Sequence, residues 1–357
     1  MNNNIKKFAN RYFIEKEDCC AVISSQINRR YFTNFVSSNG MLIVFKDAAY
    51  FLTDFRYIQV AKSMIKDAEV VLTSAMTKEM FNIIKKHNIK FAYFEQSLSV
   101  KDSLIYKNKF TDVRCVFDGS LDKTILNMRK IKSDYEIEQI KAAQKITDDA
   151  FSYILNYIKP GISEKDIAFE LEFFMRKKGA ESVAFDIISV SGENSSMPHG
   201  VPSDRILKPG DFLTLDFGAS YNGYKSDMTR TVGIKHLTEE QKKIYDIVLK
   251  AQTNAIKSVK SGEVCSKIDN IARQIITAAG YEKNFGHSTG HSLGLEIHEQ
   301  PIFSSKCNEV LEKNMVMTVE PGIYLDGKFG VRIEDLMIID DNLSINLTKS
   351  DKNLIIL

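Results

Sequence analysis

Residues 214–231, TLDFGASYNGYKSDMTRT, have the pattern of two short strands joined by a tight turn. The central Asn-Gly dipeptide suits a type I′ turn because both positions tolerate positive φ, so residues whose numbers sum to 445 should face each other. Asp227 then lies opposite Gly218, and Asp216 is its diagonal neighbour on the same face, with β-carbons roughly 7 Å apart or less. Carboxylates this close repel each other unless a positive group lies between them. The alternative is a surface hairpin whose two aspartates point into water.

The composition indicates a globular protein that is large enough for two domains. The chain has 357 residues, of which 44% are hydrophobic and 26% are charged. Single cores usually stop growing at about 250 to 300 residues, so two domains are expected. The formal net charge of +2 gives no indication of nucleic-acid binding. A basic run at 127–145 mixes lysines with glutamates at helical spacing and is interpreted as a solvated helix face.

The cysteines and the amino terminus favour a cytoplasmic location. The five cysteines are an odd number, scattered without a C-x-x-C pair, which fits a reducing compartment. The amino terminus lacks the apolar core of a signal peptide, and no uncharged apolar run approaches about 18 residues. We therefore expect a soluble cytoplasmic protein with no membrane partner.

Hydrophobic patterning divides the chain near Thr124. In residues 1–124, short apolar runs alternate with segments of helical period, which predicts an α/β domain. Residues 125–357 begin with helices, continue with strands and hairpins, and include two more helices at 238–260 and 264–279. Strands and helices in separate blocks predict an α+β fold for this second domain.

Two helices at the start of the second domain have specific amino-terminal signals. Ser133 is followed three residues later by Glu136, and Ser163 by Asp166. At this spacing each side chain can accept a hydrogen bond from the other residue's backbone N–H. We therefore expect a capping box at the start of both helices.

Four of the six histidines lie in segments of the second domain that are punctuated by glycine or proline. They are His199, His287, His291 and His298. Small neighbouring residues let a ligand or a metal approach the backbone closely. A lone histidine is more often a satisfied core or surface group, which is our interpretation of His87 and His236. Three histidines within twelve residues favour a functional site instead.

Residues 315–339, MVMTVEPGIYLDGKFGVRIEDLMII, are predicted to form two strands joined at the Asp-Gly dipeptide. Each strand carries one glutamate, Glu320 or Glu334, among apolar residues. A charged residue in such a run is rarely buried unless it is paired or binds a metal. The alternative is a solvated sheet face. That alternative is weaker for Glu334, because Arg332 lies two residues away on the same face and could orient its carboxylate.

The polar residues of the second domain form an oxygen-rich set of two aspartates, two glutamates and one histidine. Such a set suits two divalent transition metals. Two metals ~3.5 to 4 Å apart can share a water and polarise a carbonyl, as in two-metal hydrolases. A metal would then be the positive group between Asp216 and Asp227. No cysteine pair supports a structural zinc site.

Five segments, in this order, resemble the proline-directed metallopeptidases of the pita-bread fold, the family of aminopeptidase P and prolidase. They are SGENSSMPHG (191–200), LDFGASYNGYKSDMTRT (215–231), GHSTGHSLGLEIHE (286–299), TVEPGIY (318–324) and VRIED (331–335). The resemblance covers about residues 124–340. More weakly, NRRYFTNF and LTDFRY resemble the family's creatinase-type amino-terminal domain. The implied architecture is α+β, with a pita-bread catalytic domain after a smaller α/β domain.

The resemblance implies a role for each of these polar residues. The ligands of two metals would be Asp216, Asp227, His291, Glu320 and Glu334, of which Asp227 and Glu334 would be shared. His199 and His298 would bind the scissile carbonyl and its tetrahedral intermediate, and Glu320 would carry a proton from the nucleophile to the leaving nitrogen. The supporting residues would be His287, near the proline pocket, Tyr324 and Arg332.

The resemblance also implies a metallo-exopeptidase. The compact length favours an Xaa-Pro aminopeptidase, with an Xaa-Pro dipeptidase, or prolidase, as the alternative, because the metal site does not distinguish them. A non-catalytic binding module and a creatinase-like enzyme without metal form a different class, but these should lose ligands, and this chain keeps all five. The implied metal is manganese, with cobalt, iron or zinc as alternatives. The implied partners are a proline-containing peptide and a second copy of the chain in a homodimer.

Overall fold

The computed structural model describes residues 3–357, which form two compact units that divide between Arg129 and Lys130. Thr124, the boundary expected from the sequence, lies inside helix α6 (Ser120–Lys130). The limits 1–124 and 125–357 therefore stay a prediction. None of the helices formed by the described residues has the length and apolar composition needed to cross a membrane.

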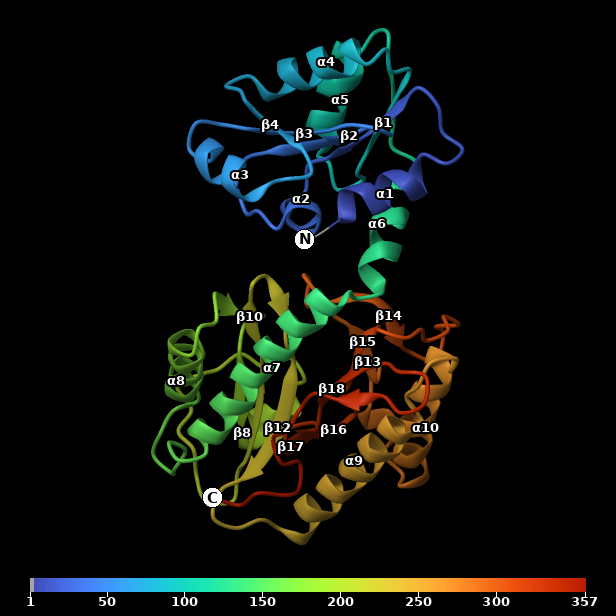
Figure 1. The fold of residues 1–357 in the computed structure, drawn as a ribbon. Helices are drawn as coiled ribbons and strands as arrows, with labels where there is room; N and C mark the ends of the chain where they lie inside the picture. The colour runs from blue at the N-terminus through green and yellow to red at the C-terminus, as the bar shows by residue number, and fades with distance from the viewer. Residues whose placement is uncertain (1–2) are drawn as a thin grey trace. The chain divides into compact units, whose positions relative to one another are not determined.

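The first unit is the expected α/β domain, built on one mixed six-stranded sheet (Figure 1). Its strands, in spatial order, are β4 (Glu69–Leu72), β3 (Ala49–Thr53), β2 (Met41–Val44), β1 (Cys19–Ile23), β5 (Phe91–Phe94) and β6 (Arg114–Val116). Its helices before α6 are α1 (Asn4–Tyr12), α2 (Gln26–Thr33), α3 (Ile58–Met64), α4 (Met76–Lys86) and α5 (Val100–Lys109). Strand β1 is antiparallel to β2 and parallel to β5. Both β1 and β2 are fully buried, as expected of continuous apolar runs.

The second unit contains several small sheets. One three-stranded sheet has the order β12 (Met228–Gly233), β9 (Phe212–Phe217), β8 (Ile188–Ser191), and another has the order β11 (Tyr224–Lys225), β10 (Ala219–Tyr221), β7 (Ser182–Val183). A five-stranded sheet has the order β14 (Glu299–Phe303), β13 (Gly290–Ser292), β15 (Val316–Val319), β18 (Asp335–Ile338), β19 (Ile345–Asn346). Strand β16 (Gly322–Leu325) pairs with β17 (Phe329–Arg332). Contacts of β12 with β18 and of β9 with β17 join these sheets.

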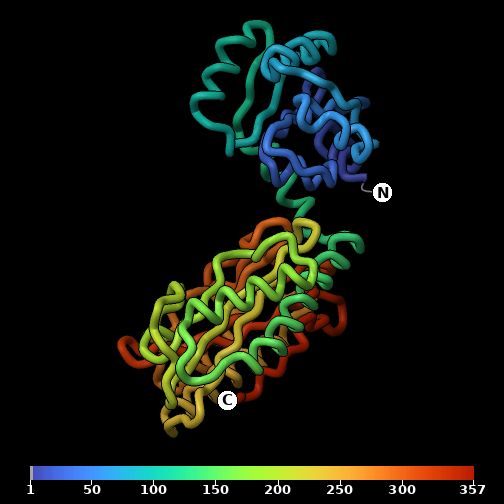
Figure 2. Tube along the Cα trace, turned by 90° about the vertical axis from the view of Figure 1, so that its left-hand side faces the viewer, coloured from blue at the N-terminus to red at the C-terminus, as the bar shows by residue number. Residues whose placement is uncertain are grey.

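Two pairs of helices cover the sheets of the second unit. They are α7 (Asp134–Ile154) with α8 (Glu164–Lys177), and α9 (Glu239–Ser258) with α10 (Cys265–Ala278). Short 3₁₀ turns occur at Gly192–Ser196 and Glu282–Asn284. Figure 2 shows α7 and α8, in green, along one face of this unit, with the orange and red segments behind them. Helices α9 and α10 pack instead against strands of the second half of the unit.

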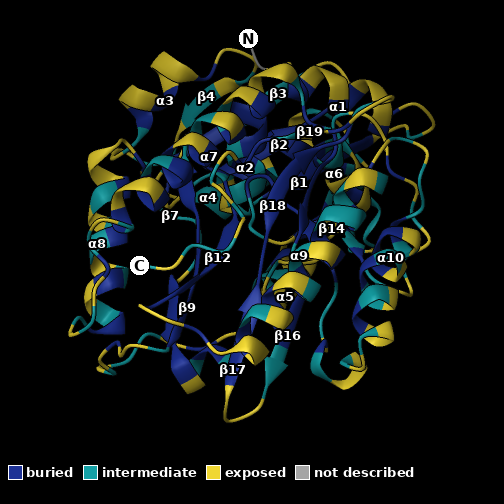
Figure 3. Cartoon of the chain, turned by 90° about the horizontal axis from the view of Figure 1, so that it is seen from below, coloured by how far each residue is buried: buried dark blue, intermediate teal, exposed yellow. Residues whose placement is uncertain are grey.

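Both predicted capping boxes are present. The Ser133 side chain and the Glu136 side chain cap each other's backbone N–H at the start of α7, and Ser163 and Asp166 do the same for α8. Each helix then buries one face. In Figure 3, helices such as α8 and α10 carry both yellow exposed and dark blue buried turns, whereas strands such as β9 and β12 are mostly dark blue. The capped helices thus form the outer layers over a core of buried strands.

The hairpin of residues 214–231 has the predicted register. Thr229 faces Asp216, and Tyr224 faces Tyr221, so the paired numbers sum to 445 on both sides of the bend between the two sheets. Asn222 has φ 46° and the glycine after it has φ 83°, the positive values that a type I′ turn requires. This register brings the strand of Asp216 beside the segment that carries Asp227.

The glutamate-bearing segment differs from the two continuous strands that the sequence predicted. The chain is interrupted at Glu320, between β15 and β16, and at Glu334, between β17 and β18. The outer strands, β15 and β18, belong to the five-stranded sheet, whereas β16 and β17 pair only with each other among the described strands. Pro321 contributes to the interruption because it has no N–H to donate to a ladder. Both glutamates therefore lie where the chain passes from one sheet to the next.

Candidate metal centre

Both aspartates of the hairpin are buried, so the alternative of a surface hairpin is wrong. Asp216, in β9, is 9% exposed, and Asp227, directly before β12, is 4% exposed. Glu334, directly before β18, is 1% exposed, which also excludes a solvated sheet face for this residue. Burial of several carboxylates is costly unless each is paired or ligates a metal. We call Asp216, Asp227, Glu320 and Glu334 the acidic cluster.

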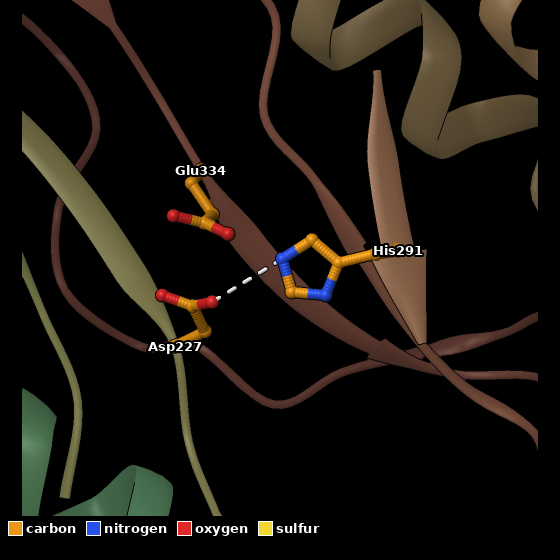
Figure 4. Close-up of side chains that lie close together, drawn as sticks. All are labelled: Asp227, His291 and Glu334. Carbon is orange, nitrogen blue, oxygen red and sulfur yellow. Dashed lines mark ion pairs between the residues drawn. The ribbon is translucent and has the colours of Figure 1, made fainter. Parts of the chain in front are cut away.

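His291 joins the acidic cluster from strand β13. Asp227, His291 and Glu334 point toward one another, and one potential ligand atom from each lies within 4.8 Å of the others (Figure 4). The Nε2 atom of His291 is 3.5 Å from Asp227 Oδ2 and 3.4 Å from Glu320 Oε1. One imidazole nitrogen thus faces carboxylates from three separate segments of the chain.

Three carboxylate oxygens of the acidic cluster are unsatisfied. Within residues 3–357, Asp216 Oδ1, Asp227 Oδ1 and Glu334 Oε1 are buried and have no hydrogen-bond partner. Buried polar atoms in proteins nearly always have a partner, so each exception needs an explanation. A divalent cation accounts for all three, because such ions bind several carboxylate oxygens at once. The residues present therefore fit a metal centre.

Burial and mutual repulsion shift the acidic cluster toward protonation. The pKa of Asp227 is raised well above its ordinary value by burial and then by the charges of Glu334 and Asp216. The pKa of Glu334 is raised in the same way, by burial and then by Glu320 and Asp216. Burial also raises the pKa of Glu320. A nearby cation acts in the opposite direction because it stabilises the ionised carboxylates.

His291 is oriented as a neutral ligand. Its Nδ1 lies 3.1 Å from the carbonyl oxygen of Ser292, and its backbone N–H donates to Thr318 Oγ1 at 3.0 Å. A proton on Nδ1 satisfies that carbonyl and leaves Nε2 as the lone-pair atom that faces the acids. Burial lowers the pKa of His291, which favours this uncharged form.

Arg332 contacts Asp216 rather than Glu334, which corrects the sequence-based interpretation. Its Nη2 donates to Asp216 Oδ2 at 2.7 Å, and its Nε donates to Thr229 Oγ1 at 3.1 Å. The Thr229 hydroxyl in turn donates to Glu334 Oε2 at 2.7 Å. Thr229 therefore links Arg332 to Glu334 by hydrogen bonds. Thr229 is not among the residues predicted from the sequence, although the 445 register, which pairs it with Asp216, is a signal that points to it.

Tyr324 links Arg332 to His287 beside the acidic cluster. Arg332 Nη1 donates to the Tyr324 hydroxyl at 2.8 Å, and that hydroxyl lies 2.9 Å from His287 Nε2. Burial raises the pKa of Tyr324 to about 12, so the phenol keeps its proton and can donate it to His287. The other ring nitrogen of His287 lies 2.8 Å from the Ser288 carbonyl oxygen, its acceptor. The three residues form one chain of hydrogen bonds.

His298 and His199 are more exposed than His291. The rings of His298 and His291 are 4.5 Å apart and nearly perpendicular. His298 and His199 are both exposed, in contrast to the buried His291. Burial lowers the pKa of His298, which favours its neutral form. The structure thus groups all four histidines, with two of them open to solvent.

Comparison with known proteins identifies the family. The chain matches metallopeptidase family M24 over residues 138–341 and the creatinase/prolidase N-terminal domain over residues 10–131. An Xaa-Pro dipeptidase of Pyrococcus horikoshii is 36% identical over 369 residues, which cover 99% of each chain.

Solved structures give the same result for the fold. A structure described as an Xaa-Pro dipeptidase from Bacillus anthracis is 40% identical, covers 100% of both chains and superposes with a TM-score of 0.95. A structure described as an X-Pro aminopeptidase from Thermotoga maritima is 36% identical, covers 95% of this chain and 97% of that one, and has a TM-score of 0.90. The expected pita-bread architecture is confirmed. The chain belongs to metallopeptidase family M24 and carries a creatinase-type domain before its catalytic domain.

Proposed function

We propose that this metallopeptidase is an Xaa-Pro dipeptidase, which hydrolyses the bond between the two residues of a dipeptide that ends in proline. The proposed metal ligands are Asp216, Asp227, His291, Glu320 and Glu334. The observation that carries the metal part of the proposal is the group of three buried carboxylate oxygens that lack a partner in the described part of the chain. When bound, two divalent ions would polarise the scissile carbonyl and activate a water. The predominance of oxygen ligands favours manganese.

Glu320 is the proposed proton carrier. Its Oε1 accepts a hydrogen bond from Thr318 Oγ1 at 3.2 Å and lies 3.4 Å from His291 Nε2, so its position at the edge of the acidic cluster is fixed. A carboxylate held in this position can act as a general base towards a bound water. In the proposed mechanism Glu320 accepts a proton from the attacking water and delivers it to the proline nitrogen as the peptide bond breaks.

His298 and His199 are the proposed groups that stabilise the oxyanion. Both are exposed, so both are accessible to a substrate. An imidazole N–H donates only weakly to a neutral carbonyl oxygen but strongly to the charge that develops on it. His287, held by Tyr324, lines the side of the site that we assign to the proline ring.

The dipeptidase proposal reverses the preference of the sequence analysis for an aminopeptidase. Full-length relatives at 36% and 40% identity carry the name Xaa-Pro dipeptidase, and these support the alternative better than the main prediction. The aminopeptidase is the second candidate, because the Thermotoga maritima structure at 36% identity has that description. The short chain length does not separate the two classes.

We also propose a cytoplasmic homodimer. Five free cysteines suit a reducing compartment, and the homodimer rests on the family resemblance. Sedimentation of the purified protein would measure the mass of the assembly, and a monomer would contradict this part of the proposal.

The experiment that tests the function compares Xaa-Pro dipeptides with Xaa-Pro-Yaa-Zaa peptides, using protein loaded with manganese and the same protein after chelation. We expect hydrolysis of the dipeptides, loss of hydrolysis on chelation and little cleavage of the longer peptides. Efficient cleavage of the longer peptides would make the protein an aminopeptidase. Full activity without metal would contradict the metal centre, and binding without hydrolysis would indicate a non-catalytic module.

A further inference from the structure

We propose that Asp269 and Arg273, one turn apart on helix α10, are positioning residues for the peptidase site. They hold the segment 285–289, and through it they fix the placement of His287 and Glu320. This inference rests on the proposed peptidase function. Neither residue belongs to the proposed metal ligands or to the histidines that face the substrate.

Asp269 is a fully buried carboxylate whose oxygens both have partners. Its Oδ1 accepts hydrogen bonds from the backbone N–H of Thr289 at 3.2 Å and from the Thr289 hydroxyl at 2.8 Å. Arg273 donates to the same oxygen from Nη2 at 2.9 Å and to Oδ2 from Nε at 2.9 Å. The exposed fraction of Asp269 is 0%. A bidentate ion pair within the helix thus extends to a residue of the loop that precedes β13.

Arg273 also donates two hydrogen bonds to backbone carbonyls of the same loop. Its Nη1 donates to the carbonyl oxygen of Phe285 at 3.0 Å, and its Nη2 donates to that of His287 at 2.9 Å. The guanidinium carbon also lies 4.4 Å from the centre of the Phe285 ring. Only a planar group with several fixed N–H donors can make these contacts simultaneously, and a lysine cannot. The pair therefore binds the loop at Phe285, His287 and Thr289.

The segment 285–289 also helps to position Glu320, the proposed proton carrier. The backbone N–H of Glu320 donates to the carbonyl oxygen of Thr289 at 2.7 Å. The next residue, Gly290, runs so close to β15 that a β-carbon there would lie 2.0 Å from the Thr318 carbonyl oxygen. A displacement of Thr289 is therefore transmitted to the strand that ends at Glu320. The same loop carries His287, whose ring contacts the Tyr324 hydroxyl.

Helix α8 offers a matched control for this arrangement. Arg176 Nε pairs with Glu172 at 2.8 Å, four residues earlier on the same helix, and its Nη1 donates to the carbonyl oxygen of Glu181 at 2.9 Å. Like Arg273, Arg176 thus combines an ion pair within its helix with a hydrogen bond to a backbone carbonyl oxygen. Its partners belong to neither the acidic cluster nor the segment 285–289. Arg176→Lys should therefore leave catalysis unchanged.

The experiment compares Arg273→Lys with Arg176→Lys. We expect Arg273→Lys to lower kcat per metal-loaded chain by on the order of 10²-fold, the size of effect that a small misplacement of reacting groups can produce. KM should change less, and metal content should stay near that of the unaltered protein. Hydrogen–deuterium exchange should become faster at residues 287–290 and at the amide of Glu320, and only in Arg273→Lys. Asp269→Asn, which keeps the shape of the side chain, should have the same effects if Arg273→Lys does not fold.

Each outcome tests either the positioning role of Asp269 and Arg273 or the proposed peptidase function. Unchanged kcat in folded, metal-loaded Arg273→Lys and Asp269→Asn would overturn the positioning role. If the unaltered protein hydrolyses no proline dipeptide or longer proline peptide, the proposed function fails, and hydrogen–deuterium exchange alone then tests the positioning role. Unchanged protection of the Glu320 amide in both variants would overturn the positioning role. An equal loss of kcat in Arg176→Lys would also overturn it, because the effect would then be a general loss of stability.

Discussion

Glu334 and Asp335 are consecutive in the chain and equally buried, yet their carboxylates have opposite surroundings. Each residue is 1% exposed. Glu334 accepts one hydrogen bond, from Thr229, while its Oε1 has no partner among residues 3–357. Burial, followed by the charges of Glu320 and Asp216, raises its pKa. The carboxylate of Glu334 is thus surrounded by other acids.

Asp335 is surrounded by cations and amides. Its Oδ1 accepts from Arg230 Nη2 at 2.7 Å, and its Oδ2 accepts from Lys352 Nζ at 2.6 Å and from Asn346 Nδ2 at 2.8 Å. Burial acts to raise the pKa of Asp335, but Arg230 and Lys352 outweigh burial and keep the pKa below its ordinary value. This carboxylate is satisfied by the protein itself.

The difference separates a structural carboxylate from one that is arranged for a ligand. A buried acid that is paired with protein cations is costly to remove, whereas buried acids grouped with one another destabilise the fold until a cation binds. Neither burial nor residue type distinguishes Glu334 from Asp335. The identity of the surrounding groups does, and the following predictions test that distinction.

The largest expected effect is on turnover. Asp227→Asn removes a negative charge from the acidic cluster, so metal content should fall and hydrolysis of Xaa-Pro dipeptides should drop to background while the protein stays folded. Metal analysis, a peptide-hydrolysis assay and circular dichroism would measure these changes. Asp204→Asn, at a side chain that is 88% exposed, is the matched control and should keep full activity. Near-normal rates and metal content in Asp227→Asn would remove the basis for treating the acidic cluster as a ligand site.

The second expected effect is a loss of unfolding free energy. Asp335→Asn leaves Arg230 buried without its full counter-charge, and loss of one partner of a buried ion pair costs about 3 to 5 kcal/mol of unfolding free energy. Denaturant titration would measure this loss. The matched control is Asp340→Asn, which weakens an exposed pair with Lys313 and should change stability little. A small effect of Asp335→Asn would mean that the two neighbouring carboxylates do not differ as we infer.

Sequence reasoning anticipated much of the fold and of the candidate site for identifiable reasons. The hairpin register followed from one Asn-Gly turn, and the helix starts followed from two capping boxes, because these signals act over a few residues. The residues grouped around the acidic cluster could be nominated because charged residues in apolar strands are unusual.

Contacts between distant segments could not be predicted in the same way. Nothing in VRIED indicates that Arg332 turns to Asp216 instead of Glu334, since this depends on how β17 lies against β9. The breaks at Glu320 and Glu334 were missed because an apolar run does not reveal a change of sheet. Asp269 has ordinary helical spacing to Arg273, and only the packing of α10 against the segment 285–289 makes Asp269 distinctive.

A third prediction extends the comparison to His298, whose side chain, in the described part of the chain, is neither buried among acids nor paired with a cation. His298→Ala should lower kcat by ~10²- to 10³-fold, roughly 2.7 to 4 kcal/mol, the range for loss of one oxyanion donor. Metal content should stay unchanged and KM should rise much less, because the donor acts mainly on developing charge. His291→Ala should instead release metal. If both variants released metal equally, the separation between ligand and oxyanion donor would be wrong.

The smallest expected effect is a gain in stability, whereas most mutations destabilise a protein. In metal-free protein, Glu334→Gln gives position 334 a permanently neutral side chain, and the new amide can donate to a neighbouring carboxylate while its oxygen keeps the bond from Thr229. Single stabilising substitutions commonly add about 0.5 to 2 kcal/mol to the free energy of unfolding, and we expect an effect of this size. Thermal unfolding after chelation should therefore show a higher midpoint for Glu334→Gln than for the unaltered protein. With manganese present the order should reverse, because only the unaltered protein binds the metal fully and gains its stabilisation. If Glu334→Gln were destabilising without metal, as Asp335→Asn should be, the two carboxylates would have the same structural role.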